Sequence, residues 1–260
     1  MAPGRLAGRV ALVTGASRGL GAAIAKRFAA EGAELILLAR TVGGLEEVDD
    51  VARAAGTHAT LVPLDITDFP ALDRLGAAIY ERHKRLDVLV ANAALLGSLS
   101  PLGHIDPREW QKVVDINLTA NWRLIRSLDA LLRASRAGRA IFVTASAGRT
   151  PRAYWGAYAV AKAGLEQLAG LYASEVAMTK LKVNLVDPGP LRTRLRQQAY
   201  PGENPDSLPL PEAFTEVFVE LAEASCQRHG ERIELQPGGA ALPGANQVLQ
   251  SGKGATELAE

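Results

Sequence analysis

Val10-Ala11-Leu12-Val13-Thr14-Gly15-Ala16-Ser17-Arg18-Gly19-Leu20-Gly21 is the stretch that decides the fold of this chain. An apolar run leads into a turn with three glycines, and Ala22-Ala23-Ile24-Ala25-Lys26-Arg27-Phe28 continues it with the composition of a helix. The predicted order is therefore strand, glycine turn and helix. In this setting glycines allow a tight turn and a close approach of the backbone to a pyrophosphate, and the amides at the helix N-terminus attract the anion. The stretch predicts a phosphate-binding turn rather than an ordinary glycine-rich connection.

The rest of the chain alternates apolar runs with helical segments. Nearly continuous apolar runs, such as Leu35-Ile36-Leu37-Leu38 and Val88-Leu89-Val90, are typical of parallel strands covered on both faces. We predict an α/β fold, a Rossmann-type doubly wound and mainly parallel sheet in a single domain, whose right-handed crossovers bring all strand C-termini to one ligand-binding edge. The strands are expected near residues 9–14, 34–38, 59–64, 86–91, 139–145, 181–186 and 232–236. Residues 1–236 would form the domain, and residues 237–260, rich in Gly and Ala, would form a flexible tail.

Tyr158 and Lys162 form a second motif, one helical turn apart. The four-residue offset places both side chains on one helix face. A phenol with an ordinary pKa of about 10 is a weak acid, and a nearby ammonium favours its ionised form. The pair alone is common in helices, so it gains its meaning from the motifs upstream.

Taken together, the motifs resemble those of the short-chain dehydrogenase/reductase family. Thr14, Gly15, Gly19 and Gly21 match the family's Thr-Gly-x-x-x-Gly-x-Gly turn, and Tyr158 with Lys162 matches its Tyr-x-x-x-Lys signature. Further matches follow in order between about residues 9 and 194: Asp65, Asn92-Ala93-Ala94 (with Ala94 in place of the usual glycine), Asn117, and Pro188-Gly189 with Thr193.

The resemblance implies a nicotinamide cofactor and names the residues that would bind it. Asp65 would contact the adenine, and the turn at Pro188-Gly189 would cover the nicotinamide. The expected cofactor-binding residues are Gly15, Ser17, Arg18, Gly19, Leu20, Gly21, Arg40, Asp65, Ile66, Asn92, Ala93, Tyr158, Lys162, Pro188, Gly189 and Thr193.

The charges near the expected ribose indicate which cofactor is used. A site that prefers NAD(H) usually ends its second strand with an acid, whereas this chain has Ala39 and Arg40. Arg18 and Arg40 could clamp a 2′-phosphate, because a guanidinium pairs with phosphate in a bidentate manner. The alternative is two solvated surface arginines. We predict NADP(H) in preference to NAD(H).

The catalytic residues implied by the resemblance are Tyr158, Lys162, Asn117 and Ser146. Tyr158 would donate a proton to the substrate oxygen, Lys162 would lower the tyrosine pKa and hold the nicotinamide ribose, and Asn117 would anchor a relay water. The family's substrate-orienting serine falls on Ala145 in this chain. Neighbouring side chains on a strand point to opposite faces, so Ser146 could replace it only if the backbone shifts there, and Thr144 is a weaker candidate. Losing this hydroxyl could lower the rate about a hundredfold or more.

Three functions are compatible with these residues. The first is an NADPH-dependent oxidoreductase acting on a small-molecule carbonyl or alcohol. The second, motivated by Ala145, is an NADP(H)-binding sensor or scaffold with weak or no turnover. The third, a nucleotide-sugar epimerase or dehydratase, is disfavoured because such enzymes usually have a larger C-terminal substrate domain.

Residues 191–211 occupy the position of the family's variable substrate lid. Arg192, Arg194 and Arg196 in this segment favour a solvated positive face over a contact with an acidic substrate. Tyr154 and Trp155, just before the catalytic tyrosine, are equally suited to line the pocket or to pack in the core.

Composition excludes several other classes of protein. A chain of 260 residues with 48% hydrophobic residues can bury the core of one domain, and a net charge of +1 argues against a nucleic-acid partner. No apolar run has membrane length and no signal-peptide pattern opens the chain, so we predict a cytoplasmic protein without a membrane partner. One cysteine suits a reducing compartment. We expect no metal, because the histidines lack ligand spacing: His58, His83, His104 and His229.

The quaternary structure follows only weakly from the sequence. Helical segments near residues 107–136 and 155–178 have apolar residues on more than one face, which a partner could cover. The resemblance implies a homodimer or homotetramer through these helices.

Overall fold

The structure, a computed structural model, describes residues 4–236 and 247–248. Seven parallel strands form one sheet in the order β3-β2-β1-β4-β5-β6-β7, and β8 adds a short antiparallel edge beside β7. The strands are β1 (Val10–Thr14), β2 (Glu34–Ala39), β3 (Ala59–Pro63), β4 (Val88–Ala91), β5 (Arg139–Val143), β6 (Lys182–Asp187), β7 (Glu231–Glu234) and β8 (Gln247–Val248). The predicted doubly wound parallel sheet is therefore confirmed. Its strand order reverses between β1 and β4, which is where such sheets bind ligands.

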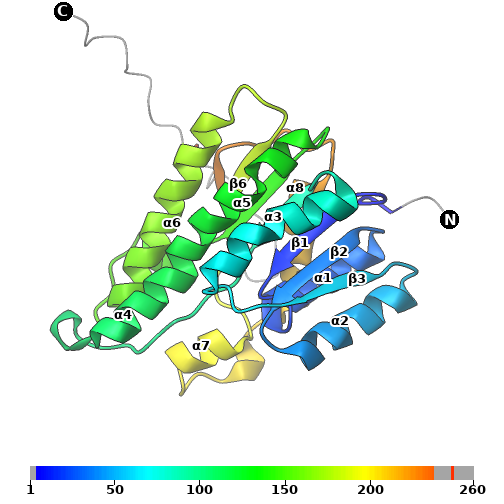
Figure 1. The fold of residues 1–260 in the computed structure, drawn as a ribbon. Coiled ribbons are helices and arrows are strands. Elements are labelled where there is room, and N and C mark those ends of the chain that lie inside the picture. The colour runs from blue at the N-terminus through cyan, green and yellow to red at the C-terminus, as the bar shows by residue number, and fades with distance from the viewer. Residues whose placement is uncertain (1–3, 237–246, 249–260) are drawn as a thin grey trace, which may run out of the picture.

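Helices cover both faces of the sheet (Figure 1). The α-helices are α1 (Gly19–Ala30), α2 (Val42–Ala54), α3 (Phe69–His83), α4 (Pro107–Val114), α5 (Ala120–Ala134), α6 (Gly156–Glu175), α7 (Arg194–Ala199) and α8 (Thr215–Ala222). Short 3₁₀ turns lie at η1 (Leu102–His104), η3 (Ser146–Gly148), η4 (Pro205–Ser207) and η5 (Pro211–Phe214). Helices α1, α2 and α8 pack on one face and α3, α5 and α6 on the other, while α7 stands apart from both layers.

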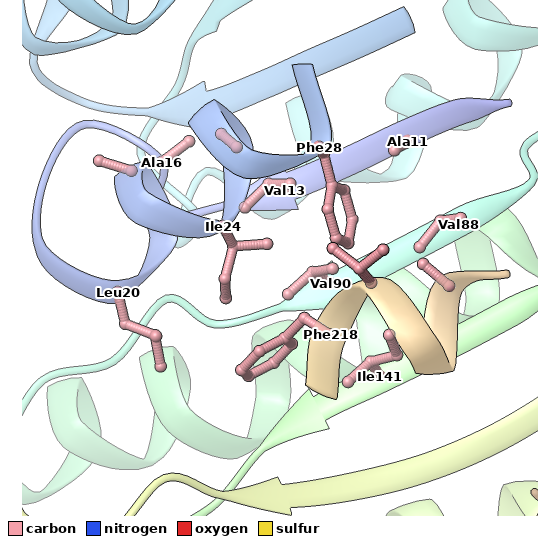
Figure 2. Packing of buried hydrophobic residues seen from close by; sticks show 14 of the residues in the cluster. Ala11, Val13, Ala16, Leu20, Ile24, Phe28, Val88, Val90, Ile141 and Phe218 are labelled. Carbon is pink, nitrogen blue, oxygen red and sulfur yellow. The ribbon is translucent and has the colours of Figure 1, made fainter. Parts of the chain in front are cut away.

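Strand register explains why the apolar runs are continuous. β1 pairs with β2 from Val10 opposite Glu34 to Thr14 opposite Leu38, and on its other side with β4. Within β1, Leu12 joins the core on one face and Val13 the core on the other, so both must be apolar. Figure 2 shows Phe28 of α1 and Phe218 of α8 in the core that contains Val13, and both side chains are fully buried.

The helix expected over residues 107–136 is interrupted by a π-helical turn, η2 (Asp115–Thr119), between α4 and α5. Two asparagines explain the interruption. The side-chain amide of Asn117 donates to the carbonyl of Val113 (2.8 Å), and that of Asn121 donates to the carbonyl of Asn117 (2.8 Å). Each side chain thus bonds the carbonyl that a regular helical N–H would use, which favours the wider turn.

Two ends of the predicted elements also change. β5 ends at Val143 instead of residue 145, because the chain turns into η3 directly after Ala145. The flexible tail predicted for residues 237–260 lies outside the described residues except for Gln247–Val248, which form β8. Among the residues that the structure describes, no helix is long and apolar enough to cross a membrane.

Candidate active site

A cavity of about 740 Å³ opens beside the C-terminal ends of the strands, next to the point where the strand order reverses. Its walls come from the glycine turn, the segments after β2 to β6, helix α6 and the lid around α7. Every residue that the sequence predicted for the cofactor or for catalysis lines this cavity, except Gly21 and Asn117. The structure therefore brings together motifs that lie far apart along the chain.

Close packing of backbone explains the three glycines. Gly15 and Gly19 have φ values of +66° and +54°, a region that favours glycine. Gly21 lies behind the turn, where an added Cβ would be 2.3 Å from the carbonyl oxygen of Gly15 and 2.6 Å from Nδ2 of Asn92. No side chain caps the N-terminus of α1, and Gly19 and Leu20 of its first turn line the cavity, so the amides of this turn are available to an anion there.

Thr14 and Asn92 lock the glycine turn to the end of β4. The hydroxyl of Thr14 accepts hydrogen bonds from the backbone amides of Asn92 (2.9 Å) and Ala93 (3.0 Å). The side-chain amide of Asn92 donates to the carbonyl of Thr14 (3.0 Å). These bonds fix the floor of the cavity at the strand reversal.

Arg18, Arg40 and Asp65 surround the expected adenosine end. Both arginines are exposed and line the cavity, and Nη1 of Arg40 lies 3.6 Å from the carboxylate of Asp65. Burial opposes ionisation of Asp65, but hydrogen bonds from Thr67 and the charge of Arg40 outweigh it and hold its pKa below the ordinary value. The carboxylate at this end of the cavity is thus already paired with a cation.

Tyr158 and Lys162 lie in the first turns of α6 and are 5% and 2% exposed. Nζ of Lys162 lies 5.7 Å from the centre of the Tyr158 ring and donates a hydrogen bond to the carbonyl of Val143 (2.8 Å). Burial raises the pKa of Tyr158, and the negative charge of Asp187 adds to this effect. This direction is opposite to the one expected from the lysine.

Burial acts on the lysine as well. Burial lowers the pKa of Lys162 to about 8, although the charges of Asp187 and Glu166 oppose the shift. Lys162 remains mostly protonated at neutral pH, so burial of the phenol and the charge of Asp187 outweigh its effect on Tyr158. In this structure, burial therefore dominates the acidity of both members of the pair.

Asn117 is fully buried and does not line the cavity. Its side-chain amide bonds the carbonyls of Leu95 (2.7 Å) and Val113 (2.8 Å), and its own carbonyl accepts from Asn121 (2.8 Å). Asn117 therefore fixes the segment after β4 to the π turn. Its side-chain oxygen accepts from the amide of Leu95 (3.4 Å), so a water anchored by Asn117 would use a second lone pair of either this oxygen or the backbone carbonyl.

Three consecutive residues lie at or beside the position of the expected substrate-orienting serine. Ala145 has extended backbone (φ −155°, ψ 154°) and its methyl group packs in the same cluster as Tyr158. Thr144 is buried, and its hydroxyl donates to Glu166 (2.8 Å). Ser146 begins the turn η3, is exposed in the cavity, and accepts a hydrogen bond from Nη2 of Arg152 (3.4 Å). Of the three, Ser146 alone has a hydroxyl available to the cavity.

A buried network of charged side chains joins β7, α6 and the end of β6 next to the cavity. The sequence analysis did not predict it. Arg232 of β7, whose side chain is 1% exposed, pairs with Glu166 of α6 (3.0 Å), with Asp187 at the end of β6 (2.8 Å), and with Glu234. Asp187 in turn accepts the amide of Gly189 (3.0 Å), in the turn expected over the nicotinamide. The sequence signal that could have revealed the network was Arg232, a charged residue within the strand predicted for residues 232–236.

The lid segment uses two of its three arginines internally. Arg192 pairs with Asp206 (3.1 Å), and Arg196 pairs with Glu203 (2.6 Å), whereas Arg194 has no acidic partner among the described residues. Thr193 begins α7 and lies next to Gly19, with a methyl group 3.4 Å from the position of an added Cβ there. The lid thus rests on the glycine turn.

Aromatic residues line the end of the cavity beside the lid. Trp155 lies 6.0 Å from Tyr158 and 5.9 Å from Tyr200 between ring centres, and it both lines the cavity and packs against the tyrosine. Tyr154 is 59% exposed, does not line the cavity, and has a φ of +75°. Arg152, which sequence analysis did not single out, lines the cavity beside Trp155.

This site and fold match a known family of enzymes. The family described as short chain dehydrogenase matches residues 9–204. This chain belongs to the short-chain dehydrogenase/reductase family and is an oxidoreductase of that family.

The similar proteins are bacterial. The chain is 35% identical to the uncharacterized oxidoreductase YciK of Escherichia coli, over 88% of this chain and 92% of that protein. It is 33% identical to the E. coli 3-oxoacyl-[acyl-carrier-protein] reductase FabG, over 72% and 75%. Among solved structures, a short chain dehydrogenase from E. coli in complex with NADPH has a TM-score of 0.86, with 34% identity over 91% of this chain and 100% of that chain.

Proposed function

We propose that this protein is an NADPH-dependent carbonyl reductase in which Tyr158 is the proton donor. The observation that carries the proposal is the position of Tyr158 and Lys162 in the wall of the cavity that also contains the glycine turn. A substrate carbonyl beside the tyrosine would share one enclosed space with the cofactor. The reductive direction is supported by the preference for NADPH proposed below.

The residues fit a dinucleotide at three places. The amides at the start of α1 form the cradle for its pyrophosphate, and the turn is shaped by Gly15 and Gly21, where an added Cβ would press against Asn92. Arg18 and Arg40 would bind the 2′-phosphate, and Lys162 would bind the nicotinamide ribose. When bound, the nicotinamide supplies the hydride that reduces the carbonyl carbon.

The side chains then supply the proton for the substrate oxygen and orient the substrate carbonyl. The hydroxyl of Tyr158 donates its proton to the carbonyl oxygen as negative charge develops there. Its raised pKa keeps the phenol protonated, as a donor must be. Ser146 donates a hydrogen bond to the same oxygen, and Asn117 holds the segment after β4 in place. In the direction of alcohol oxidation, both the proton transfer and the hydride transfer would be reversed.

The preference for NADPH rests on charge. The end of β2 has Arg40 where an acid would repel a phosphate, and Asp65 is held by that arginine. Solved relatives in complex with NADP and with NADPH support the same choice. The alternative of a binding protein without turnover is not favoured, because the similar proteins with assigned activities are oxidoreductases.

The test is oxidation of NADPH and NADH by the purified protein over a panel of aldehydes, ketones and quinones. We expect turnover with NADPH, a large loss in Tyr158→Phe, and at least a tenfold smaller preference for NADPH in Arg40→Ala. NADPH binding by the parent and by Tyr158→Phe, followed by fluorescence, shows that the variant keeps its cofactor site. A panel without turnover in the presence of bound NADPH would contradict the proposal.

We further propose a cytoplasmic homodimer or homotetramer assembled through α5 and α6. These helices expose Trp122 (44%), Val160 (51%) and Leu171 (53%), and Met178 just beyond α6 is 98% exposed. Large apolar side chains in such number on neighbouring helices suit an interface. Light scattering should give a multimer for the parent and a smaller species for Leu171→Glu.

A further inference from the structure

We propose that the carbonyl substrate bears a carboxylate and that Arg152 is the residue that binds it. This inference rests on the reductase function proposed above and goes beyond it by assigning a substrate class. It is carried by the fixed position of one cation in the substrate half of the cavity.

Arg152 is held in place by neutral partners. Nη1 donates to the hydroxyl of Tyr200 (2.9 Å), Nη2 donates to the hydroxyl of Ser146 (3.4 Å), and the guanidinium lies 5.6 Å from the centre of the Trp155 ring. Among the residues that the structure describes, no carboxylate pairs with it. A guanidinium has more N–H donors than these two bonds use, in a fork that matches a carboxylate. Arg152 is therefore oriented but not neutralised.

The backbone of this loop also fixes the arginine. Tyr154 adopts a left-handed conformation (φ +75°), and its carbonyl accepts the amide of Ser100 (3.0 Å). The amide of Trp155 closes the turn on the carbonyl of Arg152 (3.3 Å). An exposed tyrosine in this conformation is unfavourable unless its surroundings impose it, and such strain is concentrated at functional sites. The turn sets Arg152 and Trp155 side by side.

Arg152 lies at the same end of the cavity as the proton donor. Trp155 separates them, with its ring 6.0 Å from that of Tyr158. Ser146, the partner of Arg152, directly follows Ala145, whose methyl group packs near Tyr158. A substrate whose carbonyl oxygen meets Tyr158 would thus present a second group to Arg152 about one aromatic ring away.

The other charges in the cavity wall also favour an anionic ligand. Lys112 and Arg194 also line the cavity without an acidic partner among the described residues. The cavity's carboxylates, Asp65 and Asp187, are paired with Arg40 and Arg232. The cavity wall therefore has unpaired positive charge, and both of its carboxylates are already paired with arginines. Arg152 lies in the loop before α6, outside the segment 191–211 whose arginines were expected to form a solvated positive face.

The test compares an acid with its ester. The probes are 4-formylbenzoate and methyl 4-formylbenzoate, which place an aldehyde and the second group on opposite ends of one ring. We expect the parent to prefer the acid by tenfold or more in kcat/KM. Arg152→Gln should lower kcat/KM for the acid roughly 10- to 100-fold and change that for the ester less than threefold. Arg152→Lys should restore part of the preference.

Arg74→Gln is the matched control, because Arg74 is an exposed arginine of α3 outside the cavity wall. Arg74→Gln changes the net charge by the same amount as Arg152→Gln and should leave the preference for the acid over the ester unchanged. Equal use of acid and ester by the parent, or an equal loss of both in Arg152→Gln, would overturn the inference.

A second readout separates this inference from the proposed function. Benzoate and benzamide are titrated calorimetrically into the complex of the protein with NADP⁺, which requires no turnover. Binding of benzoate that exceeds binding of benzamide and is lost in Arg152→Gln supports the anion site even if neither aldehyde is reduced. Equal binding of both, or no binding of benzoate, contradicts it whether or not the reductase function holds.

Discussion

Replacing Arg232 by methionine should destabilise the protein strongly, because the buried guanidinium is the shared counter-ion of Glu166 and Asp187. Methionine fills similar volume but leaves Asp187 without an ion-pair partner and leaves Glu166 paired only with Arg149 (3.2 Å). The side chains of Glu166 and Asp187 are 11% and 7% exposed, so water cannot replace the lost contacts. We expect a loss of about 3–5 kcal/mol in the free energy of unfolding. This is a large part of the 5–15 kcal/mol or so typical of a domain.

The loss of stability in Arg232→Met should depend on pH. Burial already raises the pKa of Asp187, although the amide of Gly189 and the charge of Arg232 oppose it. Without Arg232 this pKa rises further, so the folded variant takes up a proton more readily than the unfolded chain does. Stability that depends on protonation is present at low pH and is lost as pH rises. The deficit of Arg232→Met should therefore be largest near neutral pH and shrink as the pH falls.

Urea unfolding followed by circular dichroism at neutral and at mildly acidic pH measures both effects. Arg139→Met is the matched control, because Arg139 is 2% exposed and donates to backbone carbonyls instead of carboxylates. It should destabilise the protein without any recovery at low pH. A loss below about 1 kcal/mol for Arg232→Met, or an equal loss at both pH values, would refute the reasoning.

Three further predictions concern the site itself. Ala145→Ser fits the extended backbone but should change kcat for a neutral aldehyde less than about threefold, because Ser146 already donates to the carbonyl oxygen; a gain of tenfold or more would mean that Ser146 does not reach it. Gly21→Ala places a Cβ 2.3 Å from a backbone oxygen and should cost about 1–3 kcal/mol and weaken NADPH binding, whereas unchanged urea and fluorescence titrations would count against the cradle. Because burial lowers the pKa of Lys162 to about 8 from 10.5, the unfolded chain holds more protons between these values and parent stability rises with pH there. Lys162→Met should thus abolish turnover yet be more stable below pH 8, by roughly 1–3 kcal/mol, and a variant without this advantage at pH 7 in urea would contradict it.

Local patterns were enough to predict the fold and most of the residues that line the cavity at the ends of the strands. The parallel strands follow from apolar runs such as Leu35–Leu38, and the spacing of Gly15, Gly19 and Gly21 is a short pattern within one segment. Such patterns can be recognised locally, although Gly15 and Gly19 also lie against Ala93 and Thr193 from distant segments. The structure accordingly gathers those residues at the predicted edge of the sheet.

Features that depend on distant contacts could not be predicted in this way. Arg232 meets Glu166 and Asp187 only because β7 docks beside β6, and Arg152 meets Tyr200 only because the lid folds back. The direction of the Tyr158 pKa likewise depends on complete burial, which no four-residue motif encodes. The sequence identifies the participants, but folding determines their charges.

The π-helical turn at Asp115–Thr119 has a consequence for how this region can change during evolution. A π turn amounts to one extra residue within a helix, and one residue corresponds to about 100° of rotation. Deleting a single residue there would let α4 and α5 run on as one regular helix, but it would turn Lys112 and Val113 about a quarter of a circle relative to Asn121. Homologous chains should therefore tolerate substitutions in α4 far better than a change of length between Val113 and Asn121. A one-residue gap in that interval would mark a descendant whose substrate pocket has been rebuilt.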